Sequence, residues 1–238
     1  MEETTGQPPL CRDRPEPGVL RVRLNRPERR NALDRPVLDA LLETFAAPDA
    51  TVVVLGSTSR AAFCAGVDMR LEDDERAGVS DLLYELYGRM TASDAIVVAA
   101  LDGPAVGGGA QLAVAADLRV ASPAARIQVA GPGHGLAVAA WGLPSLVGRG
   151  RAMDLCLTMR SVVAEEALDI GLVDRLDEDA EAAALELAGR LAALDPPAAA
   201  RVKHVAWSAA RALDALEAER TGNRGWSGAL KGRGPAGG

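Results

Sequence analysis

The sequence predicts an α/β protein whose strands pair largely in parallel. Short apolar runs with strand patterns alternate with helical segments along most of the chain, which is typical of βα architectures. The 238 residues, 48% of them hydrophobic, suffice to bury a full core in one domain with an appendage. Only 3% of the residues are aromatic, so we expect alanine, valine and leucine to form that core.

The first half of the chain opens with a stretch rich in Pro, Glu and Arg at residues 1–17, which we expect to be a disordered lead-in. Residues 19–24 alternate apolar side chains with arginine and predict a half-exposed strand. Asp34 is expected to cap a helix that has Pro36 in its first turn and ends near Ala47. Further elements are expected as strands over 51–55, 63–69 and 96–101, an acidic solvated loop over 72–76, and a helix over 81–90.

The second half continues the alternation. A helix is expected over 108–117, and Gly171 is expected just past the end of a later helix. Strands are expected over 118–121, 126–129 and 172–175, and helical segments over 137–146, 149–159, 164–170 and 180–194. A Pro-Pro hinge at 196–197 then leads into a helix to about Glu219. We divide the chain into the lead-in (1–17), a core (18–196) and a C-terminal helical segment and tail (197–238).

The amino-acid composition indicates which classes of partner and which cellular compartment to expect. A net charge of −7 argues against nucleic acid and anionic membranes as main partners, so an anionic ligand needs a local cationic patch. Lys203 and Lys231 are the only lysines, and arginine favours planar, multidentate contacts with carboxylate or phosphate. The three cysteines have neither metal nor disulfide spacing, and no run has the pattern of a signal peptide or a membrane span. We expect a soluble cytoplasmic protein that holds no metal and does not insert into membranes.

The most informative motif is the glycine cluster Gly107-Gly108-Gly109, between an apolar strand and an Ala-rich helix. Glycine lets the backbone approach another molecule closely, and the first turn of a helix presents N–H groups that have no partner inside the helix. Such a turn suits a phosphate or a developing oxyanion. The alternative is a tight packing point between strand and helix that binds no ligand.

Several blocks in fixed order and spacing resemble the enoyl-CoA hydratase/isomerase family, also called the crotonase superfamily. The resemblance extends over about residues 19–197. The blocks are Leu24-Asn25-Arg26-Pro27 with Asn31-Ala32-Leu33; Phe63-Cys64-Ala65-Gly66-Val67-Asp68; Gly103-Pro104 with Gly107-Gly108-Gly109; Ala116-Asp117-Leu118-Arg119-Val120-Ala121; and the later Leu146-Val147-Gly148 and Ala164-Glu165-Glu166-Ala167 with Gly171-Leu172-Val173.

The resemblance implies a spiral of ββα turns, a C-terminal helical part that assembles homotrimers or hexamers, and an acyl-CoA or enoyl-CoA thioester as substrate or ligand. No separate cofactor is implied. The family holds the thioester oxygen with two backbone N–H groups, and by motif position these belong to Val67 and Gly108. Enolate chemistry beside a thioester needs two such preorganised donors, and a backbone donor tolerates any side chain.

The chain departs from the hydratase pattern at both catalytic glutamates. Gln111 occupies the first of these positions, and the alignment puts Gly131 at the second. Glutamine can orient a water but cannot act as a base, and glycine has no side chain to do so. This combination resembles actinobacterial crotonase-like members that lack the catalytic glutamates and are suspected of binding acyl-CoA without turnover.

Replacement proton carriers are few. His134 could titrate in the useful range, but a loop histidine that faces solvent or packs against the acyl tunnel is the alternative. One acidic residue of 72–75 could overhang the pocket, although a charge run is usually a solvated loop. We expect Tyr84 and Tyr87 in the core or the pocket wall. Asp68 and Asp117 are interpreted as anchors of a loop and a strand end, and His204 is given no role.

The expected contacts with CoA come from three positions along the chain. Arg26, Arg29 and Arg30 cluster on the turn where the family meets the CoA nucleotide, with ordinary surface charge as the alternative. By family position Ala65, Gly66, Met69 and Gly107 would line the path of the ligand. The glycine-rich segment from Gly222 onward would make a weak covering helix, so we expect a loose roof over the ligand.

Three functions follow from these patterns. The first is a hydratase or isomerase with a non-standard proton carrier, and the second is a non-catalytic acyl-CoA carrier or sensor. A purely structural subunit is disfavoured, because it has little need for the intact Gly107-Gly108-Gly109 and Gly66-Val67 motifs.

Overall fold

The computed structural model describes residues 7–229 and contains two sheets in that range. In the larger sheet, of order β1-β2-β3-β4-β6-β9, every neighbouring pair from β2 onward is parallel. The smaller sheet has the order β5-β7-β8. The α/β class with largely parallel pairing is therefore confirmed. The strands are β1 (Leu10–Glu16), β2 (Val19–Leu24), β3 (Val52–Ser57), β4 (Ile96–Leu101), β5 (Ala105–Val106), β6 (Leu118–Ala121), β7 (Arg126–Gln128), β8 (Ser161–Val163) and β9 (Arg175–Leu176).

The expected disordered lead-in is wrong for residues 10–16, which form β1. This strand pairs antiparallel with β2, and Leu10 lies opposite Leu24. Arg21 of β2 makes two hydrogen bonds to the Asp13 carboxylate, at 2.9 and 2.7 Å. Asp13 is thus a cross-strand partner, and Arg12 and Arg14 form ion pairs with Glu43 and Asp49 outside the sheet. Residues 1–6 of the predicted lead-in lie outside the described residues.

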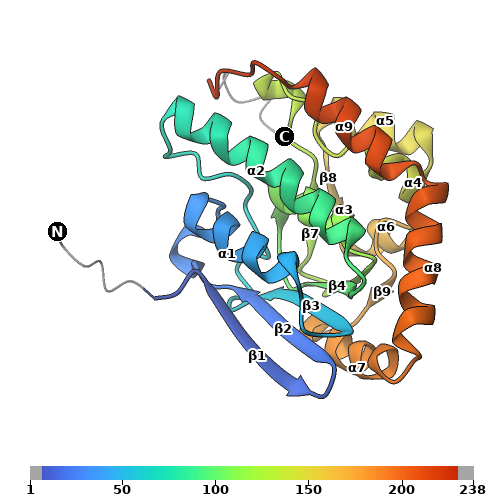
Figure 1. The fold of residues 1–238 in the computed structure, drawn as a ribbon. Coiled ribbons are helices and arrows are strands. Elements are labelled where there is room, and N and C mark those ends of the chain that lie inside the picture. Colours follow the sequence, from blue (N-terminus) through green and yellow to red (C-terminus); the bar gives the residue numbers. More distant parts are fainter. Residues whose placement is uncertain (1–6, 230–238) are drawn as a thin grey trace.

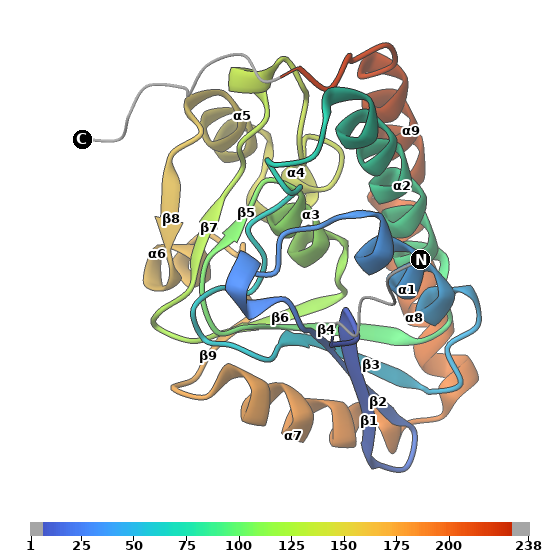
Figure 2. The same cartoon turned by 90° about the vertical axis from the view of Figure 1, so that its left-hand side faces the viewer.

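Helices cover both faces of the larger sheet (Figure 2). One face packs against α7 (Ala180–Ala192), whose Ala180, Ala184 and Leu187 meet the valines of β3 and β4 in a small apolar cluster. The main core lies on the opposite face, under α1 (Arg35–Ala46), α2 (Asp73–Ala92) and α3 (Gly108–Ala115). Asp34 caps α1 as predicted, since its carboxylate accepts a hydrogen bond from Val37 N at 3.1 Å.

Three predicted helix boundaries are wrong. Helix α2 begins at Asp73, because three acidic residues in its first turn favour the positive end of the helix dipole. Residues 137–141 are not helical, and α4 (Leu143–Val147) starts only after them. The predicted C-terminal helix is broken at Arg211, whose φ of 50° is left-handed, into α8 (Pro196–Ala209) and α9 (Ala212–Gly222).

The break turns the chain so that α9 runs back over α2 (Figure 1). Its C-terminal end thereby reaches the side of the molecule where the glycine cluster lies. The remaining elements are the short turns η1 (Pro27–Arg29) and η2 (Pro132–His134), and the helices α5 (Arg149–Thr158) and α6 (Ala164–Asp169). Within residues 7–229, no helix has the length and apolar character needed to cross a membrane.

Candidate functional site

Backbone hydrogen bonds join the sequence blocks that carried the resemblance. Cys64 N donates to Pro104 O at 3.1 Å, and Val106 N donates to Cys64 O at 2.9 Å. Leu33 N donates to Gly66 O at 2.7 Å, which adds the first block to the other side of the same segment. Three blocks far apart in the sequence therefore form one rigid backbone unit.

Two glycines permit this close approach. Gly66 has a φ of 88°, and a Cβ on it would lie 2.7 Å from Val106 O and 3.3 Å from Gly108 N. A Cβ on Gly109 would lie 2.2 Å from Cys64 O, closer than any side chain tolerates. Glycine at these positions brings the segment 64–67 directly against the start of α3.

A cavity of about 280 Å³ lies at this junction. Its walls come from the two glycine-containing segments, α2, the loop after β7 and the chain beyond α9. The site residues predicted from the sequence that line it are Ala65, Gly66, Val67, Met69, Gly107, Gly108, Gln111 and His134. The cavity is also lined by four residues that were not predicted from the sequence: Arg76, Ser80, Leu83 and Trp226.

Two backbone amides in the cavity wall have no acceptor. Within the described part of the chain, neither Val67 N nor Gly108 N donates a hydrogen bond to another protein group. Gly108 is the first residue of α3, so its N–H also lies at the positive end of the helix dipole. Both residues that carry these unpaired N–H groups line the cavity.

Gln111 is fixed by its neighbours. It is 4% exposed, and its Oε1 accepts hydrogen bonds from Ala139 N at 2.9 Å and Trp141 Nε1 at 3.0 Å. Among the described residues its Nε2 has no acceptor, so the amide nitrogen is the polar group that Gln111 offers to the cavity. This arrangement can orient a ligand and cannot accept a proton.

Gly131 does not line the cavity. A Cβ at this position would lie 2.4 Å from Val138 Cγ2 and 2.8 Å from Leu136 O. The loop therefore excludes any side chain here, and no carboxylate could replace the missing second glutamate without rearrangement.

The three arginines of the η1 turn also lie outside the cavity lining. Arg26 is an internal anchor, because its guanidinium pairs with Asp34 at 3.0 Å and with Asp68 at 3.4 Å. Arg29 is half-buried and its Nη1 has no partner among the described residues, whereas Arg30 is exposed. Arg26 is therefore a structural arginine, whereas Arg29 and Arg30 form no salt bridge to a carboxylate of the described residues.

The other candidate carriers and anchors are readily placed. His134 is half-buried in η2 and lines the cavity, whereas the acidic run 72–75 is exposed and does not. The Asp68 carboxylate accepts a hydrogen bond from Arg70 N at 3.1 Å. The Asp117 carboxylate accepts from Val97 N and from Trp207 Nε1, both at 2.7 Å. Both aspartates thus serve as anchors rather than as bases facing the cavity.

A buried carboxylate behind the cavity escaped the sequence analysis. Glu219 of α9 is 7% exposed, and it accepts hydrogen bonds from Trp141 N at 3.0 Å and from the hydroxyl of Tyr84 at 3.2 Å. Burial raises the pKa of Glu219 to about 6, while those donors lower it. Tyr84 lines the cavity. No sequence signal marks Glu219 among the other glutamates of its helix.

The chain after α9 closes one side of the cavity. Trp226 lines it and donates from Nε1 to His134 O at 3.0 Å. Asn223 donates to the Tyr84 hydroxyl oxygen at 2.6 Å and to Ala137 O at 2.7 Å, and Arg76 donates to Gly228 O. Residues 223–229 form no helix, and side-chain hydrogen bonds attach them to α2 and to the loop after β7, so the expected loose roof stays a prediction. The rest of the predicted tail, 230–238, lies outside the described residues.

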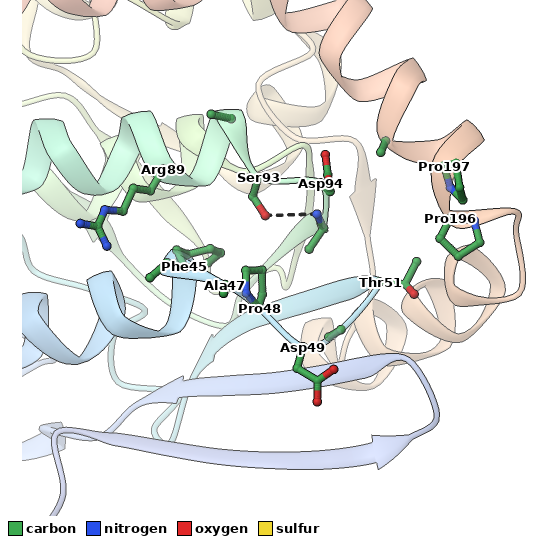
Figure 3. A pocket seen from close by; sticks show the side chains of 15 residues that line it. Phe45, Ala47, Pro48, Asp49, Thr51, Arg89, Ser93, Asp94, Pro196 and Pro197 are labelled. Atoms are coloured by element: carbon green, nitrogen blue, oxygen red, sulfur yellow. Dashed lines mark hydrogen bonds between the residues drawn. The ribbon is translucent and has the colours of Figure 1, made fainter.

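A larger hollow of about 1,090 Å³ lies elsewhere, between the α1–β3 connection, the end of α2 and the start of α8 (Figure 3). Prolines and alanines dominate its wall, together with Arg89, Asp49 and Asp94. Arg89 already donates to Leu42 O and to Glu85. None of the predicted site residues lines this hollow, so the smaller cavity is the candidate site.

The fold and the cavity define an α/β protein with backbone amides, unpaired among the described residues, in a cavity at the N-terminus of α3. The family model described as enoyl-CoA hydratase/isomerase matches residues 14–230. A Mycobacterium bovis protein named probable enoyl-CoA hydratase echA6 is 42% identical over 191 residues, which cover 77% of this chain and 78% of the relative. The chain therefore belongs to the enoyl-CoA hydratase/isomerase family.

Solved structures agree with this assignment. A monofunctional enoyl-CoA isomerase from M. smegmatis is 31% identical, with a TM-score of 0.75 over 89% of this chain and 99% of that one. An enoyl-CoA hydratase from Mycobacterium avium subsp. paratuberculosis is 29% identical, with a TM-score of 0.79 over 92% of this chain and 89% of that one. The crotonase fold that the sequence motifs implied is confirmed.

Proposed function

We propose that the cavity binds the thioester end of an acyl-CoA or enoyl-CoA, with the thioester oxygen between the backbone amides of Val67 and Gly108. The observation that carries this proposal is that both amides lack a protein acceptor and line the same cavity. A carbonyl oxygen accepts two hydrogen bonds, and it gains negative charge when the neighbouring carbon loses a proton. Each preorganised donor is then worth roughly 2.7–4 kcal/mol of barrier.

The CoA nucleotide is expected to meet Arg29 and Arg30. Both lie on the η1 turn and retain guanidinium groups that no described carboxylate neutralises within salt-bridge distance. Arginine suits phosphate because its planar donors bind two oxygens at once. In this proposal Arg26 holds the 66–68 segment through Asp68 and does not contact the phosphates.

The chemistry in the cavity differs from hydration by two glutamates. Gln111 is neutral and held by two donors, and the loop around Gly131 has no space for a carboxylate. Any hydratase or isomerase activity therefore uses another proton carrier. A non-catalytic acyl-CoA carrier or sensor is the second candidate, favoured by the same two replacements.

The experiment removes one amide donor. Gly108→Pro eliminates the N–H at the first position of α3, where helices accept proline, and Gly108→Ala is the matched control that adds a Cβ but keeps the N–H. Titration calorimetry with butyryl-CoA takes the alanine variant as the reference, because the added Cβ itself would lie 3.1 Å from Leu83 Cδ1. The proline variant should bind about tenfold more weakly, as expected for one lost hydrogen bond. Equal affinities of folded proline and alanine variants would refute the placement of the thioester oxygen.

A parallel assay addresses turnover. Crotonyl-CoA is incubated with the protein, and the absorbance of the enoyl thioester is followed after binding has been measured. Loss of the absorbance band selects the enzyme, whereas tight binding with an unchanged spectrum selects the carrier or sensor. No binding of either thioester would reject both functions.

A further inference from the structure

The hydroxyl of Tyr84 in the cavity wall has a carboxylate as its hydrogen-bond acceptor. Tyr84 lines the cavity, and its hydroxyl donates to Glu219 Oε1 at 3.2 Å, with Ala137 O as a weaker acceptor at 3.4 Å. Asn223 Nδ2 donates to the same hydroxyl oxygen at 2.6 Å. A tyrosine hydroxyl has one proton and two acceptor lone pairs, so one lone pair remains for a ligand.

Glu219 is held as an acceptor behind this hydroxyl. Its second oxygen accepts from Trp141 N at 3.0 Å, on the loop that Gln111 holds from the other side. Tyr84 belongs to α2, Glu219 and Asn223 to the α9 end of the chain, and Trp141 to the loop before α4. Contacts from three separate parts of the chain thus fix the orientation of the pair.

We propose that Tyr84 is the proton-transfer group of this cavity and that Glu219 is its positioning partner and proton acceptor. The proposal rests on the proposed binding of an acyl thioester and adds the group that the missing glutamates leave unassigned. The ligand class is an acyl-CoA or enoyl-CoA with a removable proton beside the thioester. The activity is reversible removal of that proton, as needed for isomerisation or α-hydrogen exchange.

The step balances without a further reactant. The C–H bond at the α-carbon breaks, and its electron pair enters the thioester as an enolate whose oxygen faces the amides of Val67 and Gly108. The released proton binds the Tyr84 oxygen as the original hydroxyl proton passes to the Glu219 carboxylate. The reverse transfer returns a proton to the α-carbon, or to the γ-carbon of an enoyl chain, and restores both groups.

The charge states of the pair fit this direction of transfer. Burial raises the pKa of the Tyr84 hydroxyl, so the group stays protonated near neutral pH and needs an acceptor to act as a base. The pKa of Glu219 is about 6, so its carboxylate is ionised above that pH. The titratable and charged groups around the pair are Tyr87 and Asp81 of α2, Cys156 of α5, and Arg76 and His134, which line the same cavity as Tyr84. Burial raises the pKa of Tyr87 and Cys156, so both stay neutral at neutral pH, and Asp81 is exposed.

The test measures deuterium incorporation at the α-carbon of butyryl-CoA in D₂O by NMR, together with the affinity for the same thioester. Tyr84→Phe keeps the ring and removes the hydroxyl, and Glu219→Gln keeps an acceptor oxygen but cannot take the proton. We expect the exchange rate to fall about 100-fold or more in each variant, the usual range for a lost acid–base group, with affinity near that of wild type. Glu217→Gln, which alters an exposed glutamate of the same helix, is the matched control and should exchange at the wild-type rate.

The pH profile separates proton transfer from mere support of the fold. The wild-type exchange rate should rise as pH increases through about 6, because the Glu219 carboxylate accepts a proton only when ionised. Glu219→Gln should abolish that inflection. If Tyr84→Phe does not fold, this profile still tests the role of Glu219 as the proton acceptor.

The outcomes distinguish this proposal from the proposed function. Failure of wild type to bind butyryl-CoA would remove the thioester site itself. Binding without exchange in wild type, or exchange that persists in folded Tyr84→Phe, would overturn the proton-transfer role and leave the binding function intact. Exchange that shows no inflection near pH 6 would overturn the role of Glu219.

Discussion

At the scale of single residues, the site is defined by two positions, Gln111 and Gly131, that supply no carboxylate for acid–base chemistry. The Gln111 side-chain oxygen accepts hydrogen bonds from Ala139 N and Trp141 Nε1. Gly131 packs against Val138, which leaves no space for a Cβ. The surroundings of position 111 therefore suit a neutral amide, and those of position 131 suit a residue without a side chain. Acid–base chemistry, where it occurs, must use groups outside the two family positions.

Glu219 makes stability depend on pH. Its pKa is raised from 4.5 to about 6 in the folded protein, so the folded state holds this proton more tightly than the unfolded chain. The resulting stabilisation is fully present below pH 4.5 and is lost as pH rises through about 6, by about 2 kcal/mol in total. Urea unfolding of wild type and Glu219→Gln across this range should show the difference between the two proteins shift by that amount. A constant difference from about pH 4 to 7 would contradict the raised pKa.

At the scale of elements, one buried ion pair joins α8 to the sheet and to α2. Lys203 is 4% exposed and donates to Asp117 Oδ2 at 2.9 Å, and also to Met90 O and Ala95 O, each at 2.8 Å. Asp117 lies just before β6 and also accepts from Trp207 Nε1, one turn along α8. The pair therefore fixes the helix that leads into α9 and so positions Glu219.

Breaking this pair should be costly. Asp117→Asn leaves the buried Lys203 cation without its counter-charge, and we expect the free energy of unfolding to fall by about 3–5 kcal/mol. The double variant Asp117→Asn with Lys203→Met removes the stranded charge and should recover part of that loss. Guanidinium denaturation of the three proteins tests this prediction. A loss below about 1 kcal/mol in Asp117→Asn would show that the pair does not hold α8 in place.

At the scale of the whole molecule, local secondary structure and motif positions could be predicted from the sequence, whereas contacts between residues distant in sequence could not. The helix cap at Asp34, the strand at 96–101 and the gathering of Val67, Gly108 and Gln111 at one cavity follow from periodicity and motif position. The β1 strand was not predicted because the partners of its charged residues are distant in sequence: Asp13 pairs with Arg21 of β2, whereas Arg12 and Arg14 pair with Glu43 and Asp49. Glu219 was hidden because its partner Tyr84 lies 135 positions away in sequence, a contact that depends on the helix break at Arg211.

The surface of α8 leads to a prediction about assembly. Val202 and Val205 are 71% and 69% exposed, and Leu194 and Leu213 are also open to solvent. Val202 and Val205 lie on one face of α8, and an exposed apolar helix face is typical of a protein interface, so we propose that this face associates copies of this chain. Light scattering after size exclusion should give three or six times the chain mass, and Val202→Glu with Val205→Glu should lower it. A monomeric wild type at micromolar concentration would contradict the proposal.

The central claim is that the amides of Val67 and Gly108 together bind one thioester oxygen. Amide NMR of ¹⁵N-labelled protein, titrated with butyryl-CoA, tests it most directly. We predict that both N–H signals move downfield with a single shared dissociation constant, because each gains an acceptor that it lacks in the free protein. Saturable binding that leaves either signal unmoved would contradict the claim.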